Sequence, residues 1–360
     1  MKITHVMPAF TKGGGERCAA ELANHALSKG HETTVIVGWQ VDPKLLRDKL
    51  LPNVNVIYVS KNPGSKIGRY FKLIVWLYKN KKFLNDQDII HCHLSYGMMF
   101  GFLVRIWRSI KRANVPLIVQ TNHSVGAPVS NFRRWLQYFF AKQCDALALI
   151  AEDEFWSSFA KKHPKILTKV ILNGISQRNN QTISASKRDI YRTKAGIPTH
   201  CKLVVGAIGR MTADREPWTY LPIFKEIANE FGHDVHFLLA GGGSELNRMR
   251  SLAIEYGLEK QVHFPGEVNE PTMCFAIMDL YISINVGKIT GLAGMEAAMY
   301  GLPVIAIQWT KGYNSGPEDW IWSSTNQLKV AKRSCELLSS TLSLKLLGRK
   351  QKLYVKSHHT

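Results

Sequence analysis

Acidic residues are scarce in this chain: its 360 residues include 27 Asp and Glu against 47 Lys and Arg, which gives a formal net charge of +20. This imbalance predicts an anionic partner, which is a nucleic acid, a membrane surface or a phosphorylated substrate. Cysteine pairs are also missing. The six cysteines are scattered without a C-x-x-C pair, which argues against a disulfide framework or a cysteine zinc site and favours buried thiols in a reducing compartment.

Long hydrophobic runs are absent too. No apolar segment reaches the roughly 20 residues that a membrane-spanning helix needs, and residues 1–8 have the pattern of a strand and not of a signal peptide. We therefore expect a cytoplasmic protein. What the chain does have is an apolar fraction of 45%, and over this length it predicts a globular protein of two domains.

Residues 280–306 predict a strand, a glycine turn, a helix and a second strand. Residues 280–284 are apolar, Leu292–Tyr300 are mostly helix formers, and Gly301 stands where a helix end favours a left-handed residue. The free amides at the start of this helix would face the carboxyl edge of a parallel sheet, where nucleotides and phosphates bind. Glu296 is able to accept two hydrogen bonds from a ribose diol. Taken alone, it is better explained as a surface residue favoured by the helix dipole.

The start of the chain predicts a similar unit. Ile3–Met7 reads as a strand, Glu16–Ser28 as a helix and Thr33–Val37 as the next strand, with the triplet Gly13–Gly15 after the first strand. This order is typical of a Rossmann-like domain, although the triplet lacks the G-x-G-x-x-G spacing of dinucleotide-binding proteins. By itself the triplet predicts only a turn.

Residues 61–140 concentrate the positive charge, with 13 Lys or Arg and 2 Asp or Glu. Aromatic residues interleave with these cations in segments 69–79, 102–108 and 132–140. Amphipathic helices of this composition can lie in a lipid headgroup layer, with Trp and Tyr at the interface and cations on anionic lipid. The alternative is an ordinary helix whose aromatic face lies in the core. Because no nucleic-acid-binding motif is present, a membrane is the preferred partner.

Two predicted strands end in histidine. His91 and His93 alternate in segment 88–93, so their side chains point the same way, and His123 ends segment 117–123. Such a pair resembles part of a metal site. We identify no third ligand at a suitable spacing, and we therefore predict no metal.

Five motifs in order resemble those of the family-four retaining glycosyltransferases. They are the glycine loop 13–17, the histidine strand 88–93, the sequence Val-Ile-Leu-Asn-Gly-Ile at 170–175, the strand end Gly209-Arg210 and the segment 288–304. The resemblance covers most of the chain. It implies an α/β fold of the GT-B type, with two facing Rossmann-like domains and the active site in the cleft between them.

The resemblance also implies how the chain is divided. The expected parts are an acceptor-side domain at residues 1–176, a polar linker at 177–190, a nucleotide-sugar donor domain at 191–345 and a basic tail at 346–360.

Active-site residues follow from the same motifs. Arg210 and Arg215 would neutralise the donor diphosphate as it leaves, and His123 would approach the sugar, so these three are the predicted catalytic residues. Glu296 would bind the ribose. The predicted donor-binding residues contact the diphosphate, ribose, base or sugar, and they are Gly13, Gly14, Gly15, Glu267, Val268, Lys288, Gly291, Leu292 and Glu296.

Two positions depart from the family pattern. Lys288 stands where relatives have an acid that hydrogen-bonds the donor sugar, and an ammonium group cannot accept such bonds. Glu216 and Pro217 stand where a glycine is usual, which changes the loop that carries Arg215. We therefore expect either an altered donor sugar, or a protein without turnover that binds nucleotides or a membrane on the same scaffold.

The implied reaction transfers a sugar from a UDP- or GDP-linked donor to an acceptor hydroxyl, with retention at the anomeric carbon and without a metal or other cofactor. Together with the basic aromatic segments, the resemblance predicts a glycan or polyprenyl-linked acceptor in surface polysaccharide or glycoconjugate synthesis. It also predicts an anionic membrane surface as partner, no nucleic acid, and a peripheral location on the cytoplasmic face of the inner membrane.

Overall fold

The structure is a computed structural model that describes residues 1–10, 13–61, 64–111, 116–123, 130–175, 184–198, 200–268, 271–285, 291–308 and 320–359. Contacts divide the chain into two compact units, Met1–Asn173 (unit 1) and Gly174–Thr360 (unit 2). The division falls close to the boundary expected after residue 176. Part of the expected linker 177–190 is helical, because helix α8 begins at Ala185.

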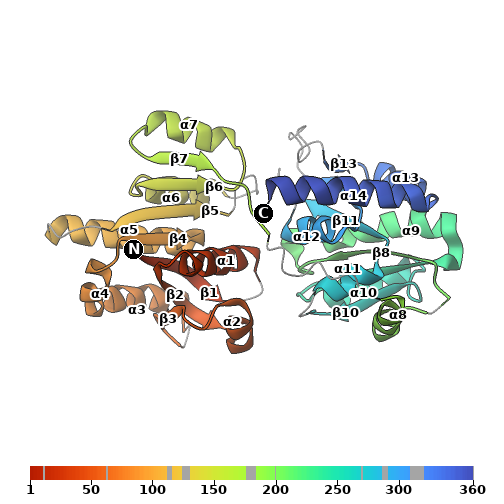
Figure 1. Ribbon diagram of the computed structural model, residues 1–360, viewed down its shortest axis with the longest axis horizontal. Helices are drawn as coiled ribbons and strands as arrows, with labels where there is room; N and C mark the ends of the chain where they lie inside the picture. Colours follow the sequence, from red (N-terminus) through yellow and green to blue (C-terminus); the bar gives the residue numbers. More distant parts are fainter. Residues whose placement is uncertain are drawn as a thin grey trace. The chain divides into compact units, whose positions relative to one another are not determined.

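Within its described residues, unit 1 contains one parallel sheet of seven strands, in the order β3-β2-β1-β4-β5-β6-β7. The strands are β1 (Lys2–Phe10), β2 (Glu32–Val41), β3 (Asn55–Tyr58), β4 (Ile89–His93), β5 (Leu117–Asn122), β6 (Ala146–Leu149) and β7 (Leu167–Val170). The helices are α1 (Gly14–Ser28), α2 (Pro43–Lys49), α3 (Lys66–Lys79), α4 (Lys81–Asn85), α5 (Leu94–Lys111), α6 (Asn131–Ala141) and α7 (Glu154–Lys162). Figure 1 draws these elements in red to yellow-green, with helices alternating with strands along the chain.

The first strand of unit 1 is buried along its middle. Residues 4–7 of β1 are buried in succession, because a central strand of a parallel sheet is covered on both faces. Met7 and Val35 belong to one buried cluster with the alanines of α1, whose small side chains let the helix backbone approach the sheet. The strand predicted at Ile3–Met7 and the helix predicted at Glu16–Ser28 are confirmed.

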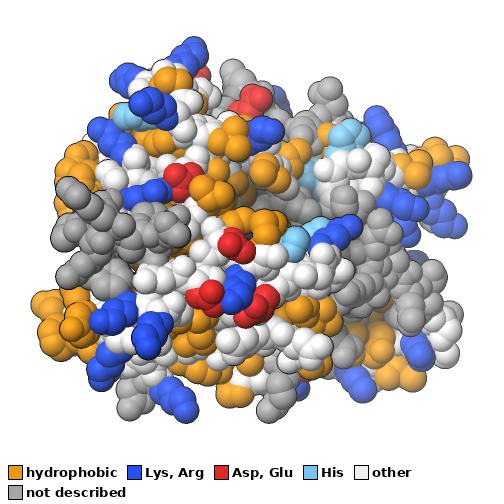
Figure 2. All heavy atoms as spheres, turned by 60° about the vertical axis from the view of Figure 1, so that its left-hand side comes forward, with side chains coloured by type: hydrophobic (Ala, Val, Ile, Leu, Met, Phe, Trp, Pro, Cys, Tyr) orange, Lys and Arg blue, Asp and Glu red, His pale blue; other side chains and the backbone are white. Residues whose placement is uncertain are grey.

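Helix α3 of unit 1 is apolar on two faces. One face is buried through Leu73, Trp76 and Leu77. A second stripe at helical spacing is exposed, and it consists of Ile67, Phe71, Ile74 and Tyr78, which are 84%, 68%, 55% and 66% exposed. These aromatic side chains therefore face solvent and not the core. Figure 2 shows hydrophobic side chains (orange) lying at the molecular surface among lysines and arginines (blue).

Helix α6 of unit 1 repeats this arrangement. Phe132, Trp135 and Phe139 are 69%, 58% and 40% exposed, and the Trp135 ring lies 6.1 Å from the ring of Phe132 and 5.7 Å from that of Phe139. Arg133 and Arg134 are exposed on the same helix. Within the described part of the chain, no helix combines the length and the apolar character needed to cross a membrane.

In the part of unit 2 that the structure describes, there is one parallel sheet of six strands, in the order β10-β9-β8-β11-β12-β13. The strands are β8 (Leu203–Ile208), β9 (Val235–Ala240), β10 (Val262–Gly266), β11 (Leu280–Asn285), β12 (Val304–Gln308) and β13 (Trp322–Ser324). The α-helices are α8 (Ala185–Lys194), α9 (Tyr220–Phe231), α10 (Leu246–Glu255), α11 (Pro271–Ile277), α12 (Leu292–Tyr300), α13 (Gln327–Leu338) and α14 (Thr341–His358). Short 3₁₀ turns, η2 (Ala213–Arg215) and η3 (Pro217–Thr219), follow β8.

The expected basic tail at 346–360 is largely helical and packs into unit 2. It lies mostly in α14, where Gln351 is fully buried. The Gln351 side-chain oxygen accepts a hydrogen bond from the Val304 amide at 2.8 Å, and its nitrogen donates to the carbonyls of Val304 at 2.8 Å and Trp320 at 3.0 Å. The last helix therefore completes the hydrogen bonding of β12.

Both sheets share the strand order of the Rossmann fold, in which the chain reverses direction across the sheet between two central strands. These are β1 and β4 in unit 1, and β8 and β11 in unit 2. Ligands of such sheets bind at the carboxyl edge of this switch point. Each unit therefore has one edge where functional residues are expected to gather.

Candidate active site

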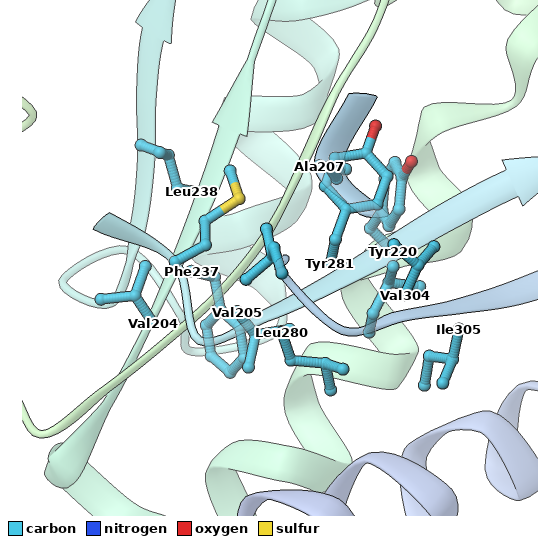
Figure 3. Packing of buried hydrophobic residues seen from close by; sticks show 14 of the residues in the cluster. Val204, Val205, Ala207, Tyr220, Phe237, Leu238, Leu280, Tyr281, Val304 and Ile305 are labelled. Carbon is cyan, nitrogen blue, oxygen red and sulfur yellow. The ribbon is translucent and has the colours of Figure 1, made fainter. Parts of the chain in front are cut away.

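Strands β8 and β11 separate at the switch point of unit 2. Their pairing runs only from Leu280 opposite Val205 to Tyr281 opposite Gly206. Beyond that point the Tyr281 side chain replaces the backbone hydrogen bonds of the sheet. The Ile208 amide donates to its hydroxyl at 3.2 Å, and the hydroxyl donates to the Ile208 carbonyl at 3.1 Å. Figure 3 shows Tyr281 beside Tyr220 in the buried core of this unit.

The loop after β8 is held by a second glycine triplet. A Cβ on Gly241 would lie 1.8 Å from the Gly209 oxygen, and one on Gly243 would lie 2.1 Å from the Met211 oxygen. Only glycine fits at this approach. The amide of Met211 donates to the Gly242 carbonyl at 2.9 Å. The backbone on both sides of position 210 is thus fixed.

Arg210 and Arg215 meet at Asp214. A guanidinium nitrogen of Arg210 lies 3.5 Å from the Asp214 carboxylate, and Arg215 Nε lies 3.7 Å from the same oxygen. The Thr212 hydroxyl, followed by the two guanidinium groups, holds the pKa of Asp214 below its usual value. Burial, followed by the like charge of Arg210, lowers the pKa of Arg215. An anion placed between the two cations would relieve this repulsion.

The loop that carries Arg215 contains a left-handed residue. Glu216 has φ of 45° and ψ of 53° and precedes the buried Pro217. Family members have a glycine near this position, according to the resemblance. Glu216, which replaces this glycine, thus has a backbone conformation that glycine adopts without strain.

A further predicted donor-binding region, Glu267 and Val268, lies at the same edge of unit 2. A Cβ on Gly242 would lie 2.7 Å from Cγ of Glu267, so Glu267 covers the glycine triplet behind Arg210. Glu267 is exposed, and Val268 is half-buried against the core of the unit. The structure therefore brings the Glu267 loop and the Arg210 loop together.

Helix α12 begins and ends where the sequence predicts. Gly291 is its N-cap, Leu292 is its first residue, and Gly301 ends it with a φ of 99°. Glu296 is half-buried in the second turn. Burial raises the pKa of Tyr281, and the neighbouring Glu296 carboxylate raises it further. Because Tyr281 also binds Ile208, Glu296 belongs to the same region as the end of β8.

The glycine loop of unit 1 lies beside one of the predicted histidines. Gly13 is the N-cap of α1, and the Arg17 amide donates to its carbonyl at 3.1 Å. A Cβ on Gly15 would lie 3.1 Å from the Leu94 side chain and 3.5 Å from the His123 ring. Gly15 and His123 are thus neighbours. Gly14, which follows the N-cap, is the first residue of the helix.

His123 ends a buried chain of histidines that the sequence did not reveal. His5 Nδ1 lies 3.2 Å from His93 Nε2, and His93 Nδ1 lies 3.2 Å from His123 Nε2. His91 Nε2 lies 2.7 Å from the hydroxyl of Thr121. Burial lowers the pKa of His5 and of His123 to about 4, so both are neutral at pH 7.

The expectation that no third ligand accompanies His91 and His93 is wrong. His5, His91 and His93 each present one potential ligand atom, and these atoms lie within 4.8 Å of one another. The cause is sheet register: His5 of β1 pairs directly with His91 of β4. Because 86 residues separate these two positions, local spacing gave no signal.

The predicted site residues thus form two groups, one in each unit. Arg210, Arg215, Glu267, Val268, Gly291, Leu292 and Glu296 gather at the carboxyl edge of unit 2, and Gly13, Gly14, Gly15 and His123 gather in unit 1. Lys288 lies outside the described residues. Sequence reasoning missed Asp214, Tyr281 and His5, whose roles depend on contacts distant in sequence.

Comparison with known proteins agrees with this geometry. A model of Glycosyltransferase Family 4 matches residues 12–176, and a model of Glycosyl transferases group 1 matches residues 202–340. An uncharacterised glycosyltransferase of Haemophilus influenzae is 21% identical over 316 residues, which is 85% of this chain and 80% of that protein.

Solved structures have the same fold. HepE of Anabaena in complex with UDP and glucose superimposes with a TM-score of 0.78 at 18% identity, over 100% of this chain and 95% of that one. WaaG, a glycosyltransferase involved in lipopolysaccharide biosynthesis, has a TM-score of 0.69 at 16% identity, over 99% and 95% of the two chains. Two Rossmann-like parallel-sheet units of this kind define the GT-B fold. The chain belongs to the family-four type of glycosyltransferases, as the resemblance predicted.

Proposed function

We propose that this glycosyltransferase transfers a sugar from a nucleotide-diphosphate donor to an acceptor hydroxyl, with retention and without a metal in the transfer step. The observation that carries the proposal is the pair of cations Arg210 and Arg215 at the switch point of unit 2, held around one carboxylate. UDP is the proposed nucleotide, since HepE binds UDP.

The donor diphosphate would replace Asp214 as the partner of the two guanidinium groups. Arginine suits this role because its fork-shaped donors match phosphoryl oxygens. Amides at the start of α12, near Gly291 and Leu292, would bind the same diphosphate, and Glu296 would accept hydrogen bonds from the ribose. The glycosidic bond to the sugar would break as these groups stabilise the charge of the leaving diphosphate.

The proposed acceptor is a lipid-linked glycan at the inner membrane surface, used in surface polysaccharide or glycoconjugate synthesis. The exposed stripes of α3 and α6 support it, since aromatic side chains flanked by cations suit an anionic lipid interface. WaaG, which functions in lipopolysaccharide biosynthesis, provides an example of this fold in such a role.

A second candidate is a nucleotide-binding or membrane-peripheral protein without turnover. Lys288 favours it, because the lysine replaces an acid that relatives use to hold the donor sugar. Hydrolysis of a UDP-sugar by the purified protein separates the two: measurable release of UDP supports the enzyme, and tight UDP binding without release supports the second candidate.

Calorimetric titration with UDP, GDP and ADP tests the donor site. We expect micromolar binding of UDP, weakened by a factor of about ten or more in Arg210→Gln because a charge-assisted contact is lost. Glu296→Ala should also weaken binding. Failure of all three nucleotides to bind would overturn the proposal.

Arg248→Gln is the matched control. Arg248 is 57% exposed and lies 3.4 Å from a Glu245 carboxylate oxygen, while Arg210 is 58% exposed and lies 3.5 Å from Asp214. Arg248 stacks on the Trp218 ring at 4.3 Å, within the same unit. If both variants lost UDP binding equally, net charge and not the Arg210 site would explain the affinity.

A further inference from the structure

We propose that His5, His91 and His93 form a binding site for one divalent transition-metal ion inside unit 1. The proposed glycosyl transfer does not use this site, and the proposal stands whether or not that function is correct.

The backbone places the three imidazoles together. His91 and His93 lie two residues apart on β4, so both side chains project from the same face of the sheet. His5 lies opposite His91 in the parallel register of β1 and β4. The ring centroids of His91 and His93 are 4.2 Å apart, and that of His5 is 5.1 Å from His91 and 5.5 Å from His93.

The nitrogen separations suit a metal ion. A tetrahedral ion with metal–nitrogen bonds of about 2.0–2.1 Å requires ligand nitrogens about 3.3 Å apart. His5 Nδ1 and His93 Nε2 are 3.2 Å apart. All three ligand atoms lie within 4.8 Å of one another, so the third ring needs to move by no more than about 1.5 Å to complete the set.

The outer contacts orient two of the three rings. His91 Nε2 lies 2.7 Å from the Thr121 hydroxyl, and His93 Nδ1 lies 3.2 Å from His123 Nε2. If both nitrogens donate, the opposite nitrogen of each ring carries the lone pair that a metal needs. Metal-bound histidines commonly donate their other N–H to such a partner.

The chemistry of the donors selects the ion. Three imidazoles favour Zn²⁺, Co²⁺, Ni²⁺ or Cu²⁺, whereas Mg²⁺ and Ca²⁺ prefer oxygen ligands. A bound ion would join β1 to β4 at the switch point of the sheet. His93 Nδ1 would keep its contact with His123 Nε2.

Cobalt uptake by the full-length protein tests the site. Protein without a polyhistidine tag is produced in medium with added Co²⁺, because a site this buried is best filled during folding. We expect one Co²⁺ per chain by elemental analysis, with the intense visible absorption of tetrahedral cobalt. His5→Gln and His93→Gln should each lose the absorption band and bind Co²⁺ at least tenfold more weakly.

His236→Gln is the control, because His236 lies 2.8 Å from His263 in unit 2 and is 4% exposed. It should retain the full cobalt band. Circular dichroism identifies any variant that does not fold, and the wild-type measurement is decisive by itself. A wild type without the band would show a hydrogen-bonded histidine chain, and a band that persists in folded His5→Gln would show that cobalt binds at another site. Either result would overturn the proposal.

Discussion

The hydroxyl of Tyr281 binds both backbone groups of Ile208, at 3.2 Å from the amide and 3.1 Å from the carbonyl. The two strands that carry these residues have ceased to pair with each other at this level. One side chain thus replaces a missing stretch of sheet directly before Gly209 and Arg210. The position of the proposed diphosphate-binding cation depends on this replacement.

Tyr281→Phe should destabilise the protein by about 1–3 kcal/mol, because it leaves two half-buried backbone groups without their partner. We also expect weaker UDP binding, since the Arg210 loop loses its support. Urea denaturation and calorimetric titration measure the two effects. Tyr256→Phe, at the end of α10, removes a hydroxyl from the same unit and should change neither. Equal stability of Tyr281→Phe and wild type would contradict the role given to the hydroxyl.

Glu216→Gly should stabilise the protein by about 0.5–1 kcal/mol. A left-handed φ costs a residue with a Cβ roughly 1–2 kcal/mol, and glycine removes this strain. Part of the stabilisation is lost again, because glycine has more conformational freedom in the unfolded chain. Glu216→Ala removes the same carboxylate but keeps the Cβ, so it should not gain stability. Midpoints of urea unfolding compare the three proteins, and a gain in both variants would assign the effect to charge.

Acidification should destabilise unit 2 through its histidine pair. His263 lies 2.8 Å from His236, and burial followed by the neighbouring His236 lowers the pKa of His263 to about 4. Below pH 6.5 the His263 side chain binds a proton in the unfolded chain but not in the folded protein. The contribution of neutral His263 to the free energy of unfolding is therefore complete above pH 6.5 and falls as the pH approaches 4. The loss is at most about 3 kcal/mol.

Comparison with His263→Gln isolates this contribution from the other buried histidines. Urea unfolding of the full chain at pH 7 and pH 5 should show a smaller acid-induced loss in the variant than in the wild type. Identical losses would mean that His263 titrates normally in the folded protein.

The exposed stripes of α3 and α6 should bind anionic lipid. Vesicles containing phosphatidylglycerol should carry the wild type upward in flotation at low salt, and Phe71→Ser or Trp135→Ser should reduce the bound fraction by about tenfold, since each removes a large apolar contact. Leu346→Ser is the control: Leu346 of unit 2 is 59% exposed, close to the 58% of Trp135. Equal flotation of all variants would exclude the two helices as the lipid-binding surface.

Sequence patterns predicted the elements whose signals are local. The bounds Leu292–Tyr300, the left-handed Gly301 and the cation at the end of β8 follow from helix propensity, helix-ending residues and strand periodicity. The resemblance then supplied the two Rossmann-like domains. These features depend on residues within a few positions of one another.

Other parts of the site depend on contacts that no local pattern contains. His5 joins His91 through the register of two strands far apart in the chain, and Tyr281 reaches Ile208 across 73 residues. The exposure of Phe71 was also open from the sequence, because an amphipathic pattern gives two faces without stating which one is buried. Only the three-dimensional structure decides such questions.

The contacts of Gln351 have a consequence for the order in which the chain folds. On the ribosome, unit 1 is complete in sequence well before unit 2 and is able to fold while synthesis continues. Unit 2 is different, because Val304 and Trp320 hydrogen-bond the side chain of Gln351, which follows them by 47 and 31 residues along the chain. These hydrogen bonds can form only after α14 has been synthesised, and until then the nascent second unit offers chaperones an incomplete core.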